Sequence, residues 1–161
     1  MVGLHHTRHP TPLADQLDAI RDLAATSILG HARLATVGDW RRVDQLQPIT
    51  VAGYAVAHNG VIDNPDDLAG PGHPTDSIAL AHAYAALRAD GMHPFTALDK
   101  LVALARQRAW AVVVLDTNGR LYAHRHYHPL WRLDRPAGTY LSSQRFDPAA
   151  ELVPADQAVA F

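Results

Sequence analysis

Apolar positions recur at helical spacing in three segments of the chain. The first covers residues 12–25, where leucine, isoleucine and alanine return every three or four positions after Thr11, a capping residue type. The second lies between Thr75, which can also cap a helix, and Gly91, which suits a helix end. The third covers residues 94–107 and begins with proline, a residue favoured at the first helical position. The pattern therefore predicts three helices.

Other apolar segments have the composition and turn residues of β-strands. Asn-Gly dipeptides, which suit positive φ and hairpin turns, occur at residues 59–60 and 118–119. The segments predicted to form strands are residues 28–38, residues 49–65 on both sides of Asn59-Gly60, a hairpin over 110–126, a strand pair over 129–144 that turns at 136–138, and a short edge strand within 151–161. The segments 39–48 and 66–74 are polar or rich in glycine and proline and are expected to be loops.

The order of these elements indicates the fold class. Two helices cluster in the middle of the chain and strands lie on both sides of them, which favours an α+β layered domain over an alternating β-α-β sheet. A chain of 161 residues can bury one hydrophobic core, so we expect a single domain over residues 1–161.

Composition argues against several classes of function. The net charge is −2 with neutral histidines, so no basic surface for nucleic acid is expected. No apolar run approaches the roughly 20 residues of a membrane span, and the first residues do not resemble a signal peptide, so the expected location is the cytoplasm. The chain has no cysteine, which excludes disulfides, thiolate metal sites and a cysteine nucleophile.

Two charged residues have the chemistry to hold an amino acid. Arg33 lies in a predicted strand of small and apolar residues, and the fixed donors of its guanidinium suit a carboxylate. Asp76 lies in the first turn of a predicted helix, where the dipole stabilises a carboxylate that could bind an amino group. Taken singly, a surface ion pair for Arg33 and an ordinary helix-start acid for Asp76 are the commoner roles.

The Asn59-Gly60 pair also has two interpretations. An asparagine amide beside an unhindered glycine N–H gives two donors that could converge on one oxygen, as an oxyanion hole requires. Taken alone, the dipeptide is more commonly a hairpin turn.

Three stretches, taken together in their order, favour the functional interpretation of these residues over the commoner one. They are GHARLATVG at residues 30–38, QPITVAGYAVAHNGVIDN at 47–64 and PTDSIALAHAYA at 74–85. In this order and spacing they resemble the class II glutamine amidotransferases, which are N-terminal-nucleophile enzymes that release ammonia from glutamine. Further elements are similar to that family, namely Leu-Gln-Pro at 46–48, the hairpin that begins at Trp110, and TYLSSQ at 139–144. The resemblance covers about residues 28–144 and implies a compact four-layer α-β-β-α sandwich.

The resemblance implies how an amino-acid ligand would be bound. Arg33 would bind the α-carboxylate of glutamine, with Thr36 and Val37 in the adjoining loop, and Asp76 would bind the α-amino group. The implied ligand is glutamine or a related amino acid, and neither a cofactor nor a metal is implied.

The resemblance also implies which residues would stabilise a reacting amide. Asn59 and Gly60 would supply the oxyanion hole. His58 precedes this pair, as it does in many members of the family, and is expected to pack rather than react.

The chain departs from the family near its start. Members of the family begin with Cys-Gly-Ile or a close variant, and the thiolate attacks the amide while the α-amino group acts as base. Here Gly3 and Leu4 fit the pattern, but Val2 occupies the position of the nucleophile, and an isopropyl group cannot attack a carbonyl. The segment before Arg33 is also shorter than in the family, since only one predicted helix fills it.

Three functions remain open at this point. The first is an amidotransferase-like protein without glutaminase activity that keeps an amino-acid pocket for binding, regulation or scaffolding. The second is an active amidotransferase or amide hydrolase with an unrecognised nucleophile or a lost cysteine; an active form would need a partner synthase or acceptor subunit. The third is a structural or interaction protein that keeps only the fold.

The eleven histidines include one regular group. His124, His126 and His128 alternate, so an uninterrupted strand would place all three imidazoles on one face, where they could bind zinc. No cysteine or obvious carboxylate completes a set of ligands, and a half-exposed histidine-rich strand is the preferred interpretation.

Overall fold

The computed structural model describes residues 22, 25–32 and 42–161. Within them, the helices are the 3-10 helix η2 (Val43–Gln45) and the α-helices α2 (Pro65–Ala69), α3 (Asp76–Ala89) and α4 (Pro94–Leu104). The strands are β1 (Ile49–Val51), β2 (Tyr54–Ile62), β3 (Gln107–Leu115), β4 (Leu121–His126), β5 (Trp131–Arg135), β6 (Gly138–Ser142), β7 (Glu151–Leu152) and β8 (Val159–Ala160). The helix predicted over residues 12–25 lies almost wholly outside the described residues.

The predicted helix between Thr75 and Gly91 is confirmed as α3. The Thr75 hydroxyl oxygen accepts a hydrogen bond from the Ile78 N–H at 3.2 Å, which satisfies one of the free donors at the start of the helix. Gly91 follows the helix with a φ of 80°, a conformation that favours glycine. Two segments expected to be loops also contain short helices, namely η2 and α2.

Helix α4 begins at Pro94 as predicted but ends at Leu104 rather than Gln107. The cause is the side chain of Asn64, which donates to the Leu104 carbonyl at 3.1 Å and accepts from the Arg106 N–H at 2.6 Å. These bonds satisfy backbone groups at the helix end, and the chain then enters β3. Local periodicity cannot reveal this contact, because Asn64 lies 40 residues before Leu104.

The described strands form two antiparallel sheets. The large sheet has the order β1-β2-β3-β4-β8, and the small sheet has the order β6-β5-β7. Both predicted strand pairs are confirmed: β3 and β4 are joined through Asn118-Gly119, and β5 pairs with β6 across residues 136–137. The C-terminal segment contributes two short strands, one to each sheet.

Asn59-Gly60 does not form a turn. Both residues lie within β2, where Asn59 pairs with Ala111 and Gly60 pairs with Trp110 of β3. The chain turns instead at residues 52–53, which both have positive φ. The hairpin-turn interpretation of this dipeptide is therefore wrong.

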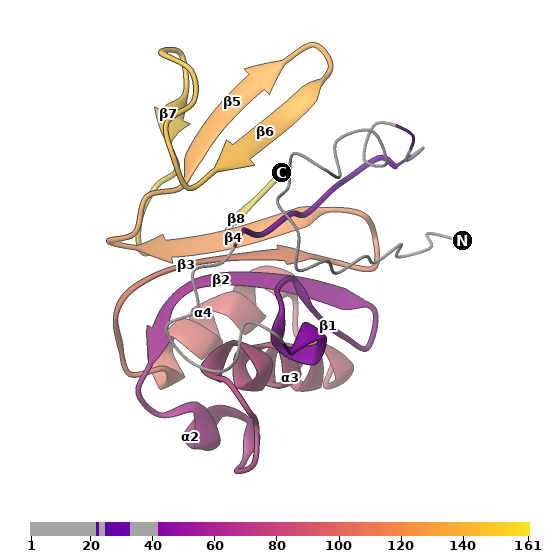
Figure 1. Cartoon of the computed structure of the whole chain (residues 1–161), viewed down its shortest axis with the longest axis vertical. Coiled ribbons are helices and arrows are strands. Elements are labelled where there is room, and N and C mark those ends of the chain that lie inside the picture. Colours follow the sequence, from indigo (N-terminus) through magenta and orange to yellow (C-terminus); the bar gives the residue numbers. More distant parts are fainter. Residues whose placement is uncertain (1–21, 23–24, 33–41) are drawn as a thin grey trace.

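Residues 25–32 run along the large sheet on the side of the small sheet (Figure 1). The Ser27 hydroxyl donates to the Gly119 carbonyl at 2.6 Å, and Leu29 packs against the apolar cluster between the sheets. Residues 28–32 do not form the predicted strand, so that prediction is wrong for this part. Residues 33–38 lie outside the described residues.

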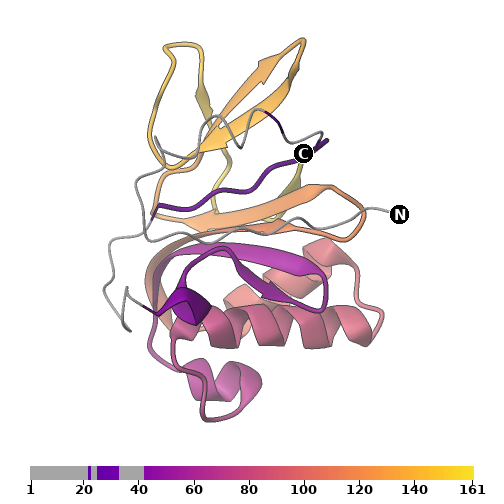
Figure 2. The same cartoon turned by 45° about the vertical axis from the view of Figure 1, so that its right-hand side comes forward.

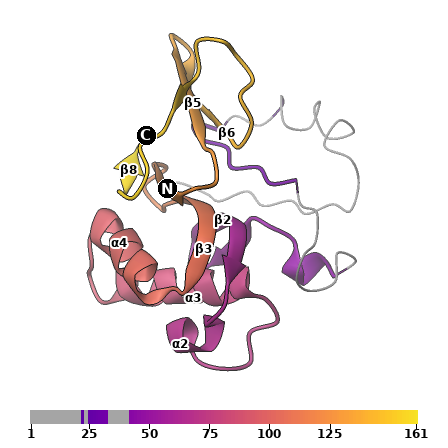
Figure 3. The same ribbon diagram turned by 90° about the vertical axis from the view of Figure 1, so that its left-hand side faces the viewer.

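Apolar clusters cover both faces of the large sheet. One cluster packs the helices against it, and its largest fully buried side chains are Trp110, Tyr84, Leu80, Leu98 and Leu101. The other joins the opposite face to the small sheet and its flanking residues, and its buried members are Val113, Ala123, Leu130 and Val153. This separation of helices and small sheet by the large sheet is visible from two further directions (Figure 2, Figure 3).

The described helices and antiparallel sheets make this an α+β protein. The α+β class predicted from the order of elements is thus confirmed. No described helix has the length and apolar character needed to cross a membrane.

Candidate functional site

The structure brings together the three predicted site residues that it describes. Asn59 and Gly60 lie near the end of β2, and Asp76 lies in the first turn of α3. All three line one cavity of about 1430 Å³, which extends between the large and small sheets. The other predicted site residues lie outside the described residues; they are Val2, Arg33, Thr36 and Val37.

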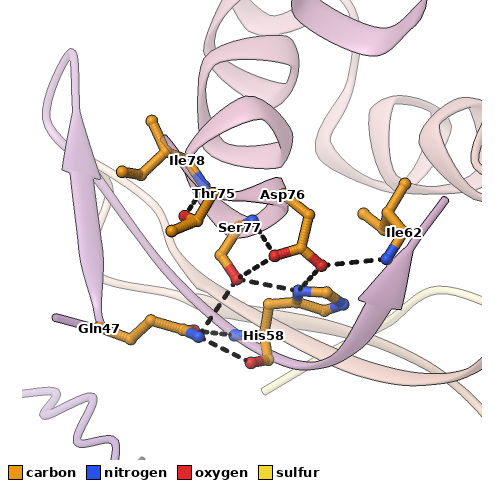
Figure 4. A network of polar contacts seen from close by, with 7 residues as sticks. All are labelled: Gln47, His58, Ile62, Thr75, Asp76, Ser77 and Ile78. Carbon is orange, nitrogen blue, oxygen red and sulfur yellow. Dashed lines mark hydrogen bonds and ion pairs between the residues drawn. The ribbon is translucent and has the colours of Figure 1, made fainter. Parts of the chain in front are cut away.

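The side chain of Gln47 completes the edge of β2 at His58, close to Ser77 of α3 (Figure 4). Strand β1 pairs only with residues 54–56 of β2, so beyond that point no strand among the described residues neighbours the backbone on this side. Gln47 Oε1 accepts from the His58 N–H at 2.5 Å, and Gln47 Nε2 donates to the His58 carbonyl at 3.0 Å. One side-chain amide therefore makes both bonds that a neighbouring strand would make.

This pairing determines where the Gly60 N–H points. In an antiparallel ladder the backbone groups of alternate residues face the same edge. Because both polar groups of His58 face Gln47, the alternation places those of Gly60 on the same edge, which no described strand covers, rather than towards β3. A β-carbon on Gly60 would lie 2.7 Å from the Ala109 carbonyl oxygen and 2.9 Å from His58 Nε2, so only glycine fits here without a shift. Asn59, the preceding residue, is exposed and lines the cavity, and its side-chain amide carries a second donor.

The Asp76 carboxylate is held by backbone donors from two elements. Its Oδ2 accepts from the Ile62 N–H at 3.0 Å, and its Oδ1 accepts from the Ser77 N–H at 2.8 Å. The Ser77 hydroxyl also donates to Oδ1 at 3.4 Å. A carboxylate offers about four acceptor positions, so the described bonds leave room for a ligand donor. The residue is 7% exposed and borders the cavity. A buried carboxylate oriented in this way is suited to a cationic amino group.

His58 lies behind the pair of donors and is 2% exposed. Its Nδ1 lies 3.1 Å from Ser77 Oγ and 3.9 Å from Asp76 Oδ2, and its ring meets Trp110 edge to face. Burial lowers the pKa of His58 from 6.5 to about 4; Asp76 opposes this shift, while His31 and His128 add to it. His58 is therefore a neutral imidazole, and the two oxygens that face Nδ1 favour the tautomer with the proton on that nitrogen. The expectation that His58 packs fits this burial.

The free energy of unfolding should depend on pH because His58 is buried in the folded protein. The pKa of His58 is about 4 in the folded protein and about 6.5 when unfolded. Between these two pH values only the unfolded chain binds a proton at His58. The contribution of the neutral buried imidazole to the free energy of unfolding is therefore complete above pH 6.5 and is lost as the pH falls towards 4. The full effect is on the order of 3 kcal/mol. We expect urea titrations from pH 7.5 to 4.5 to show a shallower loss of unfolding free energy in His58→Gln than in wild type.

A matched control for this titration is His82→Gln, because His82 is exposed on α3. This variant should keep the pH dependence of wild type. Parallel pH profiles for wild type and His58→Gln would contradict the buried neutral imidazole.

His58, Ser77 and Asp76 do not have the geometry of a catalytic triad. In a triad the two imidazole nitrogens contact different partners, so that the acid orients the base and the base activates the hydroxyl. Here Ser77 and Asp76 both approach Nδ1, and the buried Nε2 has no hydrogen-bond partner among the described residues. Ser77 Oγ also accepts from Gln47 Nε2 at 3.2 Å. The cluster holds the strand and helix in place rather than activating a nucleophile.

The three alternating histidines, two in β4 and His128 just after it, face different surroundings. His124 is buried on the helix side, where its Nδ1 accepts from Trp110 Nε1 at 3.2 Å, and burial lowers its pKa. His126 Nδ1 lies 2.6 Å from Asp156 Oδ1. A turn at the exposed Tyr127, which has a φ of 65°, redirects the chain so that His128 lines the cavity. The three imidazoles therefore do not share one face, and no group of three or more histidine or acidic side chains suited to a metal occurs in the described part of the chain.

Two members of the site were not identified from the sequence as site residues. Gln47 belongs to the Leu-Gln-Pro element, and that element was the only signal for it. Ser77 follows Asp76 directly, and nothing in its spacing distinguishes it from an ordinary first-turn serine. Gln47 acts through its bonds to the His58 backbone, and Ser77 acts through a contact with the His58 ring that the packing of α3 beside β2 creates.

A scan of the chain against protein-family models gives no match, and a search of curated proteins gives none either. A function for this chain therefore has to be argued from its own residues and their geometry.

Proposed function

We propose that the protein is a class II glutamine amidotransferase-like protein that binds glutamine or a related amino acid and lacks glutaminase activity. Its fold would be the compact four-layer α-β-β-α sandwich of the N-terminal-nucleophile type. The pocket would serve binding, regulation or scaffolding, because Val2 offers no atom that can attack an amide.

The observation that carries the proposal is the convergence of Asn59, Gly60 and Asp76 on one cavity. These residues come from a strand and a helix, and the sequence resemblance implies a role for each of them. Two donors for an amide oxygen and a carboxylate for an amino group are the complement of an amino acid with a side-chain amide.

The cation-binding role of Asp76 can be tested with a neutral replacement. Asp76→Asn keeps an oxygen acceptor for a backbone N–H but removes the charge that attracts an ammonium group. We expect the dissociation constant for glutamine, measured by calorimetry, to rise by about tenfold or more, since a charge-assisted bond contributes roughly 1.5–3 kcal/mol. Asn59→Ala should weaken binding less, by about fivefold, because it removes one neutral donor.

Asp66→Asn is a matched control, because Asp66 is exposed on α2 and makes the same change of charge away from the cavity. Its affinity for glutamine should equal that of wild type. If wild-type protein binds neither glutamine nor glutamate at millimolar concentrations, the ligand-binding function is abandoned. In that case the chain keeps the fold alone, and Asp76→Ala and Arg33→Ala change no ligand behaviour.

A further inference from the structure

Gln47 borders the same cavity as Asn59, Gly60 and Asp76, and its side-chain amide is bonded to the strand and the helix that carry these residues. It bonds both backbone groups of His58, two residues before Gly60, and it also donates to Ser77, the residue after Asp76. Gln47 is 8% exposed, and His58 and Ser77 are buried as well. One amide thus links the strand that carries the two donors to the helix that carries the carboxylate.

This link lies on the edge of β2 that faces away from β3, where no described strand pairs with the residues beyond Val56. The ladder with β1 ends at the pair formed by Ile49 and Val56. Beyond it, the described backbone contacts on this edge are those of Gln47 with His58 and of Asp76 with Ile62. Gly60 lies between these two points and next to a register shift in the pairing with β3. An unsupported edge at a register shift would let the Gly60 N–H turn away from the cavity.

We infer that Gln47 is a positioning residue for the candidate site: its amide fixes the edge of β2 so that the Gly60 N–H faces the cavity beside Asp76. The inference rests on the proposed function for its effect on ligand binding, but its effect on Gly60 does not depend on any ligand. The positioning requires an amide, because one group must accept from the His58 N–H while another donates to the His58 carbonyl.

Two substitutions separate positioning from simple packing. Gln47→Leu removes the donor and the acceptor at similar volume. Gln47→Glu keeps the acceptor but, when ionised, loses the donor and places a negative charge against the His58 carbonyl. Burial favours the neutral form of such a carboxyl, which regains an O–H donor, so lowering the pH from 7.5 to about 5.5 should restore function in this variant alone.

Other titratable side chains among the described residues also lie around Gln47. His58 from β2 stays neutral across this range because its pKa is about 4. Asp76 lies on α3, and His31 and His128 line the same cavity. Wild-type protein measured at both pH values supplies the baseline for these groups. Gln157→Glu, at an exposed position, is the matched control for the added charge.

The experiment combines amide NMR of the ligand-free protein with glutamine calorimetry. In Gln47→Leu, and in Gln47→Glu at pH 7.5, we expect the His58 amide to exchange at least about tenfold faster, the Gly60 resonance to shift, and the glutamine dissociation constant to rise about tenfold. At pH 5.5 the glutamic acid variant should return towards wild type and the leucine variant should not.

Two results would overturn the inference. One is a Gly60 resonance that stays unchanged in both variants. The other is an unchanged glutamine affinity despite faster His58 exchange, which would make Gln47 a support of the strand edge only. If wild-type protein fails to bind glutamine, the proposed function falls, and the Gly60 resonance alone decides whether Gln47 positions this residue.

Discussion

Val2→Cys, processed so that the chain begins at residue 2, is expected to release ammonia from glutamine, whereas the wild-type protein is not. The substitution adds a thiol beside the free α-amino group that would serve as its base. Removing the attacking group from an enzyme of this kind typically lowers turnover by on the order of 10⁴-fold or more, so restoring it should give the largest change in activity. A coupled ammonia assay measures the gain, and mass spectrometry verifies the new N-terminus.

Two further variants make the result specific. Val2→Ala changes the same position without adding a nucleophile and should remain inactive. In the Val2→Cys background, Asn59→Ala should lower turnover by roughly 10²- to 10³-fold, the effect typical of losing one oxyanion donor. Turnover by wild-type protein would instead support an active amide hydrolase with an unrecognised nucleophile. Glutamine binding without turnover in Val2→Cys would mean that the added thiol does not reach the bound amide.

Trp110→Ala is expected to cause the largest loss of stability, about 3–5 kcal/mol of unfolding free energy. Trp110 is 0% exposed and packs between the large sheet and the helices. Its removal leaves a cavity beside His58 and takes the only described donor away from His124 Nδ1. Since small domains have about 5–15 kcal/mol of stability in total, urea denaturation should show a far lower midpoint or no folded baseline.

Trp131→Ala is the matched control, because Trp131 makes the same change at a half-buried position in the small sheet. Its loss of stability should be clearly smaller. Trp110→Phe keeps most of the buried ring but removes the N–H donor, so it should cost about 1–3 kcal/mol through the unpaired imidazole. Equal losses for Trp110→Ala and Trp131→Ala would contradict the assignment of Trp110 to the centre of the core.

The elements that the sequence predicts correctly depend on neighbouring residues. The cap at Thr75 acts on a backbone group three residues away, and the Asn118-Gly119 turn joins adjacent strands. Such signals are local, so they can be read without knowing the fold. The errors have distant causes. Asn64 ends α4 from 40 residues away, and the pairing of Gly60 with Trp110 places an apparent turn inside a strand.

By itself the sequence determined the α+β class, helices α3 and α4, both strand pairs and the nomination of Asn59, Gly60 and Asp76. Only the tertiary structure decided that these three residues border one cavity and that Gln47 completes the strand edge beside them. It also decided that His128, which follows the turn at Tyr127, lines the cavity, whereas His124 of β4 is buried on the helix side. The physical reason is the same in each case: composition and spacing fix which groups a segment carries, but the direction of a backbone N–H or an imidazole depends on the partner that satisfies it.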